Sequence, residues 1–89
     1  MTPQQKAICR ELLALAYKAG FGCYYPLAPI AAKLGIKRRL YDNNTNTGLL
    51  WNLGKHGSGL LDITTDGTAA CVPYELKDEV ARYSGFKGI

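Results

Sequence analysis

Glycines limit the lengths of the helices that this chain can form. Gly20, Gly35 and Gly85 each follow a run in which apolar residues recur at helical spacing. Glycine adopts a left-handed backbone without a Cβ clash, so it is frequent just after the last turn of a helix. We therefore expect short helices with definite ends. In 89 residues such helices build one domain around a small core.

The first helix is predicted from Pro3 to Ala19. Thr2 is a suitable N-cap, Pro3 occupies the first helical position, and Gln5 stands three residues after the cap. This is the arrangement of a capping box, in which two side chains satisfy free backbone N–H groups. One face of this helix is apolar and consists of Ile8, Leu12, Leu15, Ala16 and Ala19.

Two further helices carry similar signals. One is predicted from Leu27 to Leu34, after a short connection over Phe21 to Pro26, with Pro29 in its first turn. The other is predicted from Tyr74 to Ser84, because Leu76, Val80 and Tyr83 fall on one helical face. Both helices end at a glycine.

The segment after Gly35 permits two interpretations. A third helix is expected to begin near Lys37, but the polar run from Asn43 to Gly48 consists of poor helix formers. Either the helix ends there and Thr47 caps a fourth helix from Gly48 to His56, or one long helix continues through. We favour the break.

A change of period after Leu60 predicts a β-hairpin. Residues 61–72 read as two short strands around Asp66-Gly67, which is a strong signal for a tight turn. Pro73 ends the second strand.

Composition excludes several functional classes. No apolar run approaches the roughly 20 residues that span a bilayer, and the N-terminal residues lack the pattern of a secretory signal, so we expect a cytoplasmic protein with no membrane partner. The three cysteines show no CxxC spacing, which favours reduced thiols over a disulfide framework or a zinc site. His56 is the sole histidine. We expect no metal, no cofactor and no catalytic residue, and hence not an enzyme.

Charge is unevenly distributed along the chain. The formal net charge is +4. Between Lys33 and Lys55 five basic residues accompany the single acid Asp42, whereas Asp62 to Glu79 holds five acids and the single base Lys77. One part of the chain is therefore suited to a polyanion, and another part repels it.

The stretch from Ile30 to Tyr41 resembles the signature of a helix-turn-helix. Ala31 and Ala32 match the small residues that let two helices approach, Gly35 matches the turn, and Ile36 matches the apolar residue that anchors it. The hairpin around Asp66-Gly67 resembles the wing of a winged helix-turn-helix domain. The resemblance implies an α+β fold with three or four helices, a two-stranded β-hairpin wing and a C-terminal helix, over residues 1–89.

The resemblance also implies a function, which is duplex DNA binding by a small bacterial or phage transcriptional regulator. The helix beginning near Lys37 would enter the major groove. The planar guanidinium of arginine forms paired hydrogen bonds with guanine or with phosphate, and the side-chain amide of asparagine forms them with adenine. The expected DNA-binding residues are Lys33, Lys37, Arg38, Arg39, Tyr41, Asn43, Asn44, Lys55 and Thr65. The wing departs from the family, since no basic residue lies between Lys55 and Lys77.

Two other features of the assembly stay open. A domain this small reads few base pairs, so a homodimer on a two-fold site fits DNA binding, with the C-terminal helix or the first helix as its interface. The alternative function is a protein–protein interaction module, an adaptor or inhibitor built on a winged-helix scaffold. Either its acidic wing and C-terminal helix would then face a basic partner, or its basic segment would face an acidic one.

Overall fold

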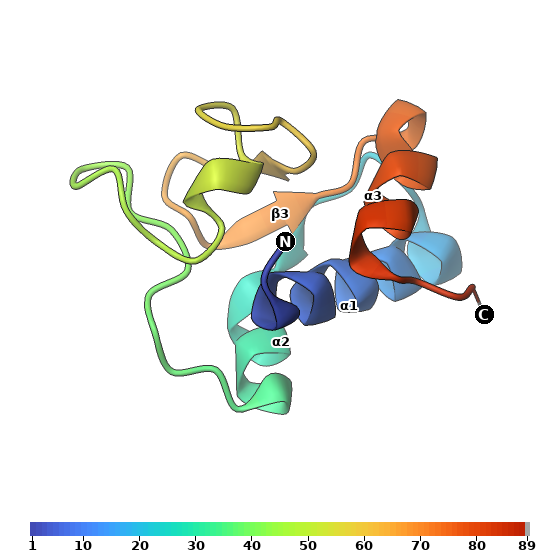
Figure 1. Ribbon diagram of the computed structural model, residues 1–89, viewed down its shortest axis with the longest axis horizontal. Helices are drawn as coiled ribbons and strands as arrows, with labels where there is room; N and C mark the ends of the chain where they lie inside the picture. Colours follow the sequence, from blue (N-terminus) through green and yellow to red (C-terminus); the bar gives the residue numbers. More distant parts are fainter. Residues whose placement is uncertain (89) are drawn as a thin grey trace.

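The computed structural model describes residues 1–88, which form a small α+β domain (Figure 1). Three α-helices and a three-stranded antiparallel sheet make up its regular structure. The helices are α1 (Pro3–Ala19), α2 (Leu27–Leu34) and α3 (Lys77–Ser84), and the strands are β1 (Tyr25–Pro26), β2 (Asp62–Ile63) and β3 (Ala69–Cys71). Two 3₁₀ helices, η1 (Trp51–Leu53) and η2 (Tyr74–Leu76), complete the order.

The caps of the three helices confirm their predicted positions. In α1 the Thr2 hydroxyl accepts a hydrogen bond from the Gln5 N–H at 3.2 Å, and the Gln5 side chain accepts one from the Thr2 N–H at 2.9 Å. Gly35 and Gly85 end α2 and α3 in the left-handed conformation. The predicted helix from Tyr74 to Ser84 is present, but its first turn is the tighter η2.

The predicted hairpin is confirmed as β2 and β3, which pair antiparallel with Ile63 opposite Ala70. The sheet has a third strand that we did not predict. The connection before α2 contains β1, which pairs with the other edge of β3 and places Tyr25 opposite Ala70. Two residues ending in a proline carry no local strand signal, so β1 depends on the edge that β3 offers it.

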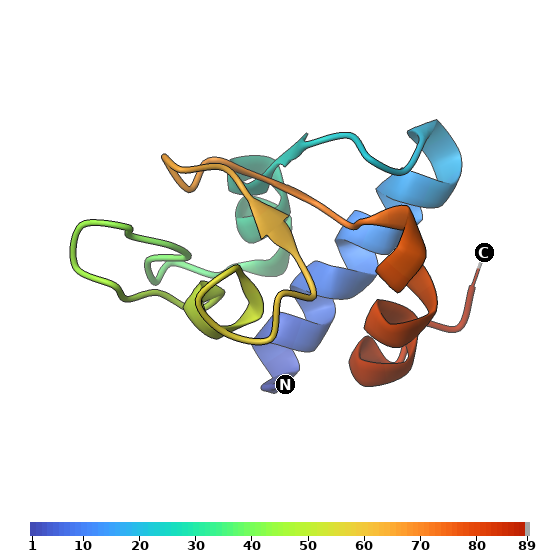
Figure 2. The same cartoon turned by 90° about the horizontal axis from the view of Figure 1, so that it is seen from above.

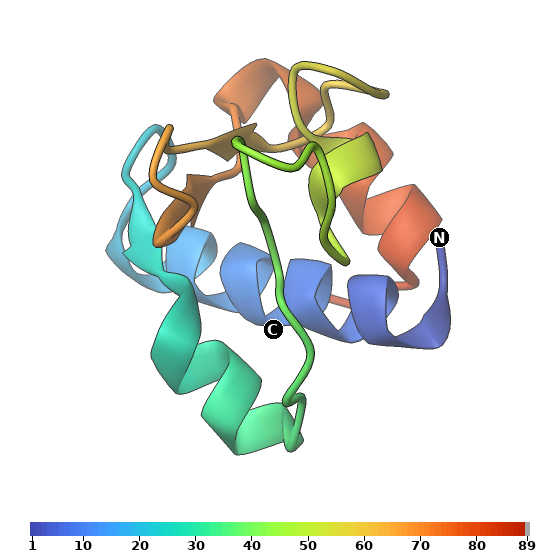
Figure 3. The same cartoon turned by 90° about the vertical axis from the view of Figure 1, so that its left-hand side faces the viewer.

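The core lies between α1 and the elements that surround it. Figure 3 shows α1 crossing the molecule with the sheet and η1 on one side, while α2 extends away on the other. α3 packs along α1 at the end of the molecule opposite to the segment before η1 (Figure 2). Fully buried side chains from these elements include Ile8, Leu12, Leu13, Leu27, Leu50, Leu61, Val72 and Val80.

The segment between α2 and η1 corrects our prediction. No α-helix begins near Lys37, so both the broken and the continuous helix were wrong. The chain runs irregularly to a tight hairpin closed by a bridge between Asp42 and Thr47. The predicted helix from Gly48 to His56 is reduced to η1.

Side chains and backbone contacts explain why the helix is absent. The Asp42 carboxylate accepts the N–H groups of Asn44 and Thr45, which a helix would use in its own ladder. Gly48 has φ +130°, and a Cβ there would lie 2.5 Å from the Leu40 carbonyl oxygen. The N–H of Leu50 donates to that same carbonyl at 2.8 Å and the N–H of Leu49 donates to the Arg39 carbonyl at 3.0 Å, so these bonds join the two sides of the hairpin instead.

Among residues 1–88, none of the helices is both long enough and apolar enough to cross a membrane.

Candidate nucleic-acid interface

A polar loop projects from one end of the domain (Figures 1 and 2). We call residues Asn43 to Asn46 the Asn loop. Two backbone hydrogen bonds between Asp42 and Thr47, at 2.8 and 3.2 Å, close it at its base. Asn46 has φ +56°, a conformation that asparagine tolerates better than most residues. The loop therefore presents three asparagine side chains on a fixed turn.

The Asp42 carboxylate organises the Asn loop from within. It accepts the N–H of Asn44 at 2.9 Å and forms an ion pair with Arg39. The Asn44 N–H is the largest cause that holds the pKa of Asp42 below its ordinary value, with smaller contributions from Thr45 and Arg39. The carboxylate is thus charged at neutral pH and serves as a structural acceptor.

The turn of the β2–β3 hairpin lies beside the Asn loop. Asp66 accepts hydrogen bonds from the hydroxyls of Thr64 and Thr68, each at 2.8 Å, and these bonds lower its pKa. Gly67 has φ +73° and packs so closely that a Cβ would lie 2.8 Å from the Tyr41 carbonyl oxygen. Close contact with Tyr41 therefore holds this turn against the segment that leads into the Asn loop.

Two open hollows flank the Asn loop, and their charges differ. The first, of about 430 Å³, lies between the loop and the β2–β3 turn and is lined by Arg39, Tyr41, Asp42, Asn43, Asn44, Thr65 and Asp66. It brings together five of the predicted DNA-binding residues: Arg39, Tyr41, Asn43, Asn44 and Thr65. It also holds two carboxylates against one guanidinium, so it is unsuited to a phosphate.

The second hollow, which we call the Arg38 hollow, lies on the other side of the loop. It measures about 380 Å³ and is lined by Thr2, Gln5, Arg38, Asn46, Thr47, Gly48, Leu49, Trp51 and Asn52. Arg38 is the one charged side chain in this lining, and it forms no ion pair within residues 1–88. Its guanidinium is therefore available to an anion from solution.

The structure distributes the nine predicted residues unequally. Eight of them are exposed, whereas Tyr41 is 8% exposed and packs its ring 4.9 Å from that of Trp51. Tyr41 is therefore a packing residue, and our assignment of it to a DNA contact does not fit its burial. Lys33 forms an ion pair with Glu11 at 2.8 Å, and Arg39 is held by Asp42. Of the predicted DNA-binding cations, Lys37, Arg38 and Lys55 form no ion pair within residues 1–88.

Sequence reasoning missed two polar residues of the Arg38 hollow. Asn46 belongs to the polar run that we assigned to a helix break, and Asn52 is the single polar side chain within the apolar stretch from Leu49 to Leu53. A polar residue inside such a stretch was the available signal. Gln5 Nε2 donates to Asn52 Oδ1 at 2.8 Å and so fixes this amide in the hollow.

The residues considered for other chemistry lie apart from the interface or pack structurally. His56 stacks its ring on Trp51 with centroids 4.7 Å apart. Burial raises the pKa of Cys9 to about 12, while Cys23 is exposed. Over the described part of the chain, no three His, Cys, Asp or Glu side chains gather into a potential metal site.

Comparison of the chain with models of protein families, with curated proteins and with solved structures finds no match.

Proposed function

We propose that this protein binds duplex DNA through the Arg38 hollow and the Asn loop beside it. The observation that carries the proposal is the unpaired guanidinium of Arg38 in a hollow without carboxylates, next to a projecting loop of amide side chains. Guanidinium groups bind phosphate through two parallel hydrogen bonds, and asparagine amides match the edge of adenine.

The arrangement separates affinity from specificity. Lys37 and Arg38 are adjacent, exposed and free of internal acids, so they supply the phosphate contacts. Asn43 and Asn44 are exposed in the loop and reach base edges once the phosphates position the domain. A loop on a fixed turn replaces the recognition helix that the sequence led us to expect.

The order of elements supports a winged-helix variant. Two helices joined to a tight turn are followed by a hairpin and a final helix, as in the resemblance described above. The element between turn and hairpin differs, since the Asn loop and η1 stand where a recognition helix was expected. We therefore propose a small transcriptional regulator of this type, with duplex DNA as its partner.

The test is a titration of labelled random-sequence duplex DNA, measured by fluorescence anisotropy at low and at physiological salt. We expect affinity that falls steeply with salt, because each phosphate contact releases counterions. The double variant Lys37→Ala, Arg38→Ala removes two such contacts. Its log–log salt slope is expected to be shallower by about 1.8, following roughly 0.9 per phosphate.

A matched control separates this surface from net charge. The C-terminal end of α1 and α3 lie at the opposite end of the molecule from the Asn loop (Figure 2), and they carry Lys18 and Arg82. Lys18→Ala, Arg82→Ala loses the same charge and is expected to bind like the wild type. Equal losses in both double variants would show that the binding has no defined surface, and absence of binding at low salt would refute the proposal.

An exposed aromatic cluster favours a second function, docking of another protein chain. Tyr17 packs against Phe21 and Phe86, and Phe21 packs against Tyr74, which is 64% exposed. Exposed aromatic groups of this kind are enriched at protein interfaces. Sedimentation over a range of concentrations tests whether a second copy occupies it: dimers weakened by Tyr74→Ala would support this function, and a monomer throughout would exclude self-association.

A further inference from the structure

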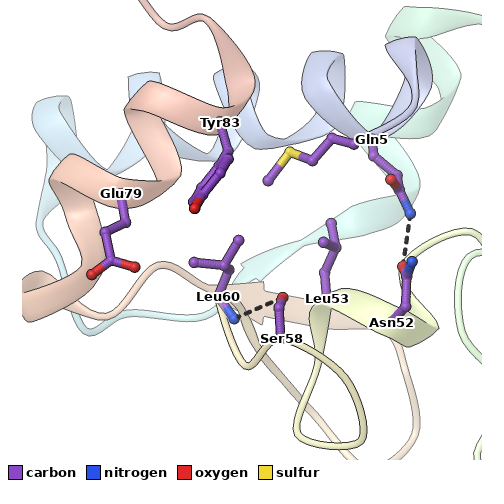
Figure 4. A pocket seen from close by; sticks show the side chains of 8 residues that line it. Gln5, Asn52, Leu53, Ser58, Leu60, Glu79 and Tyr83 are labelled. Atoms are coloured by element: carbon purple, nitrogen blue, oxygen red, sulfur yellow. Dashed lines mark hydrogen bonds between the residues drawn. The ribbon is translucent and has the colours of Figure 1, made fainter.

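A cleft on the side of the domain that joins α3 to η1 adjoins the Arg38 hollow, with which it shares Gln5 and Asn52, and extends away from it toward α3. Figure 4 shows Glu79 and Tyr83 extending from α3 toward Leu60, with Leu53, Ser58 and Asn52 on the facing segment. The cleft measures about 400 Å³, and Met1 and Gln5 complete its lining. Cavities of this size accept small organic ligands.

The floor of the cleft is apolar. Leu53 and Leu60 are almost fully buried members of the core, and Met1 packs against the same core. Tyr83 adds a ring that is half exposed in the structure. The apolar pattern of the sequence had placed this side chain on the same face of the helix as Leu76 and Val80. Because Leu53 and Leu60 are already buried, the apolar surface that a ligand removes from water is mainly that of Met1 and the Tyr83 ring, and this removal favours binding.

The polar groups of the rim divide into occupied and available ones. The side-chain N–H groups of Gln5 already donate to the Leu49 carbonyl and to Asn52 Oδ1. The Ser58 hydroxyl accepts a hydrogen bond from the N–H of Leu60 at 3.4 Å. By contrast, Glu79 forms no ion pair and no side-chain hydrogen bond within residues 1–88. The available charged acceptor is therefore the Glu79 carboxylate.

Charge selects the ligand. Glu79 is the one charged side chain that lines the cleft. The guanidinium of Arg82 lies 5.1 Å from the centroid of the Tyr83 ring, so this ring already makes a cation–π contact within the protein. Glu79 is thus the group that binds a positive charge, while Leu53, Leu60 and the Tyr83 ring cover an apolar body.

We propose that this cleft binds a small organic cation, an amine attached to an aromatic or branched aliphatic group. Glu79 and Tyr83 stand four residues apart on α3, which places them on the same face one turn apart. The spacing lets the ammonium group meet the carboxylate while the attached apolar group lies along the ring and the leucines.

The test compares two probes of equal size, 2-phenylethylamine and 2-phenylethanol, by two-dimensional amide NMR of the full chain. We expect the amine to shift the amides of Ser58, Leu60, Glu79 and Tyr83 saturably in the millimolar range. The alcohol is expected to bind about five- to tenfold more weakly, because it lacks the charge-assisted hydrogen bond. Equal binding of the two probes, or no saturable shift, would overturn the proposal.

Two variants with the same change of charge complete the test. Glu79→Gln keeps the size of the side chain and is expected to remove the preference for the amine. Glu75→Gln removes an exposed carboxylate on η2 that does not line the cleft, and it is expected to leave both affinities unchanged. Equal weakening of the amine in both variants would show attraction by overall charge and would refute a site at Glu79. The amide spectra report folding of each variant directly.

Discussion

Substitution of Gln5 by alanine is expected to destabilise the domain far more than its position in the first turn of a helix implies. The side chain is 5% exposed and makes three hydrogen bonds. Its oxygen accepts the N–H of Thr2 at 2.9 Å, and its Nε2 donates to the carbonyl of Leu49 at 2.7 Å and to Asn52 Oδ1 at 2.8 Å. One amide thus joins the capping box of α1 to η1 and to the residues just before it.

The expected loss follows from these bonds. The capping bond and the partly buried bond to Asn52 are worth about 1 kcal/mol each. The bond to Leu49 is buried, and alanine leaves that carbonyl without its donor, which costs a further 1–3 kcal/mol or so. Alanine recovers a few tenths of a kcal/mol through its helix propensity. We expect a decrease in the free energy of unfolding of about 3 kcal/mol, or a Tm lower by roughly 12–24 °C.

The assay is urea denaturation followed by circular dichroism, with Gln4→Ala as the matched control. Gln4 is exposed in the same turn of α1, and its side chain makes no hydrogen bond within residues 1–88. Its replacement is expected to change stability by less than about 0.5 kcal/mol. If Gln5→Ala were as mild as Gln4→Ala, the connection through Leu49 and Asn52 would not hold the segment in place, and the reasoning would be wrong.

Further predictions concern backbone and thiol positions. Gly67→Ala is expected to cost at least 1 kcal/mol more than Gly85→Ala in urea denaturation, because both have positive φ but only Gly67 would push a Cβ against the Tyr41 carbonyl; equal losses would contradict this. Iodoacetamide at pH 8 is expected to label exposed Cys23 in the native protein and buried Cys9 only after unfolding, as peptide mass spectrometry would show. Since burial raises the pKa of Cys9 from 9.0 to about 12, its contribution to stability is present below pH 9 and is lost as the pH rises toward 12. Cys9→Ala should flatten this decline, and an unchanged slope would count against it.

The candidate DNA surface was only partly visible in the sequence. The run Lys37-Arg38-Arg39 predicted exposed cations, and all three are exposed. Nothing in that run indicates that Arg39 pairs with Asp42 while Arg38 opens into a hollow without acids. The three residues lie on an irregular segment, so the electrostatic surroundings of each depend on which other parts of the chain pack beside it.

Helix α1 and the β2–β3 turn were determined by local sequence. The capping box of Thr2 and Gln5 lies within one turn, and Gly20 accepts its unusual φ without help from distant residues. Asp66 and Gly67 likewise complete their turn with neighbours no more than two or three positions away. Interactions this short in sequence act before the rest of the chain is in place, which is why pattern alone located these elements.

Tertiary contacts decided β1 and the segment between α2 and η1. β1 has no stability of its own and forms because β3 presents a free edge at Ala69 and Ala70. The segment after Gly35 buries Ile36, Tyr41, Leu49 and Leu50, a spacing that fits neither a helix nor a continuous strand. Its weak helix propensity loses to the burial of these side chains against α1 and the sheet. The side chains that these residues pack against lie far away in sequence. For this reason the local pattern predicted a recognition helix where the folded chain forms the Asn loop.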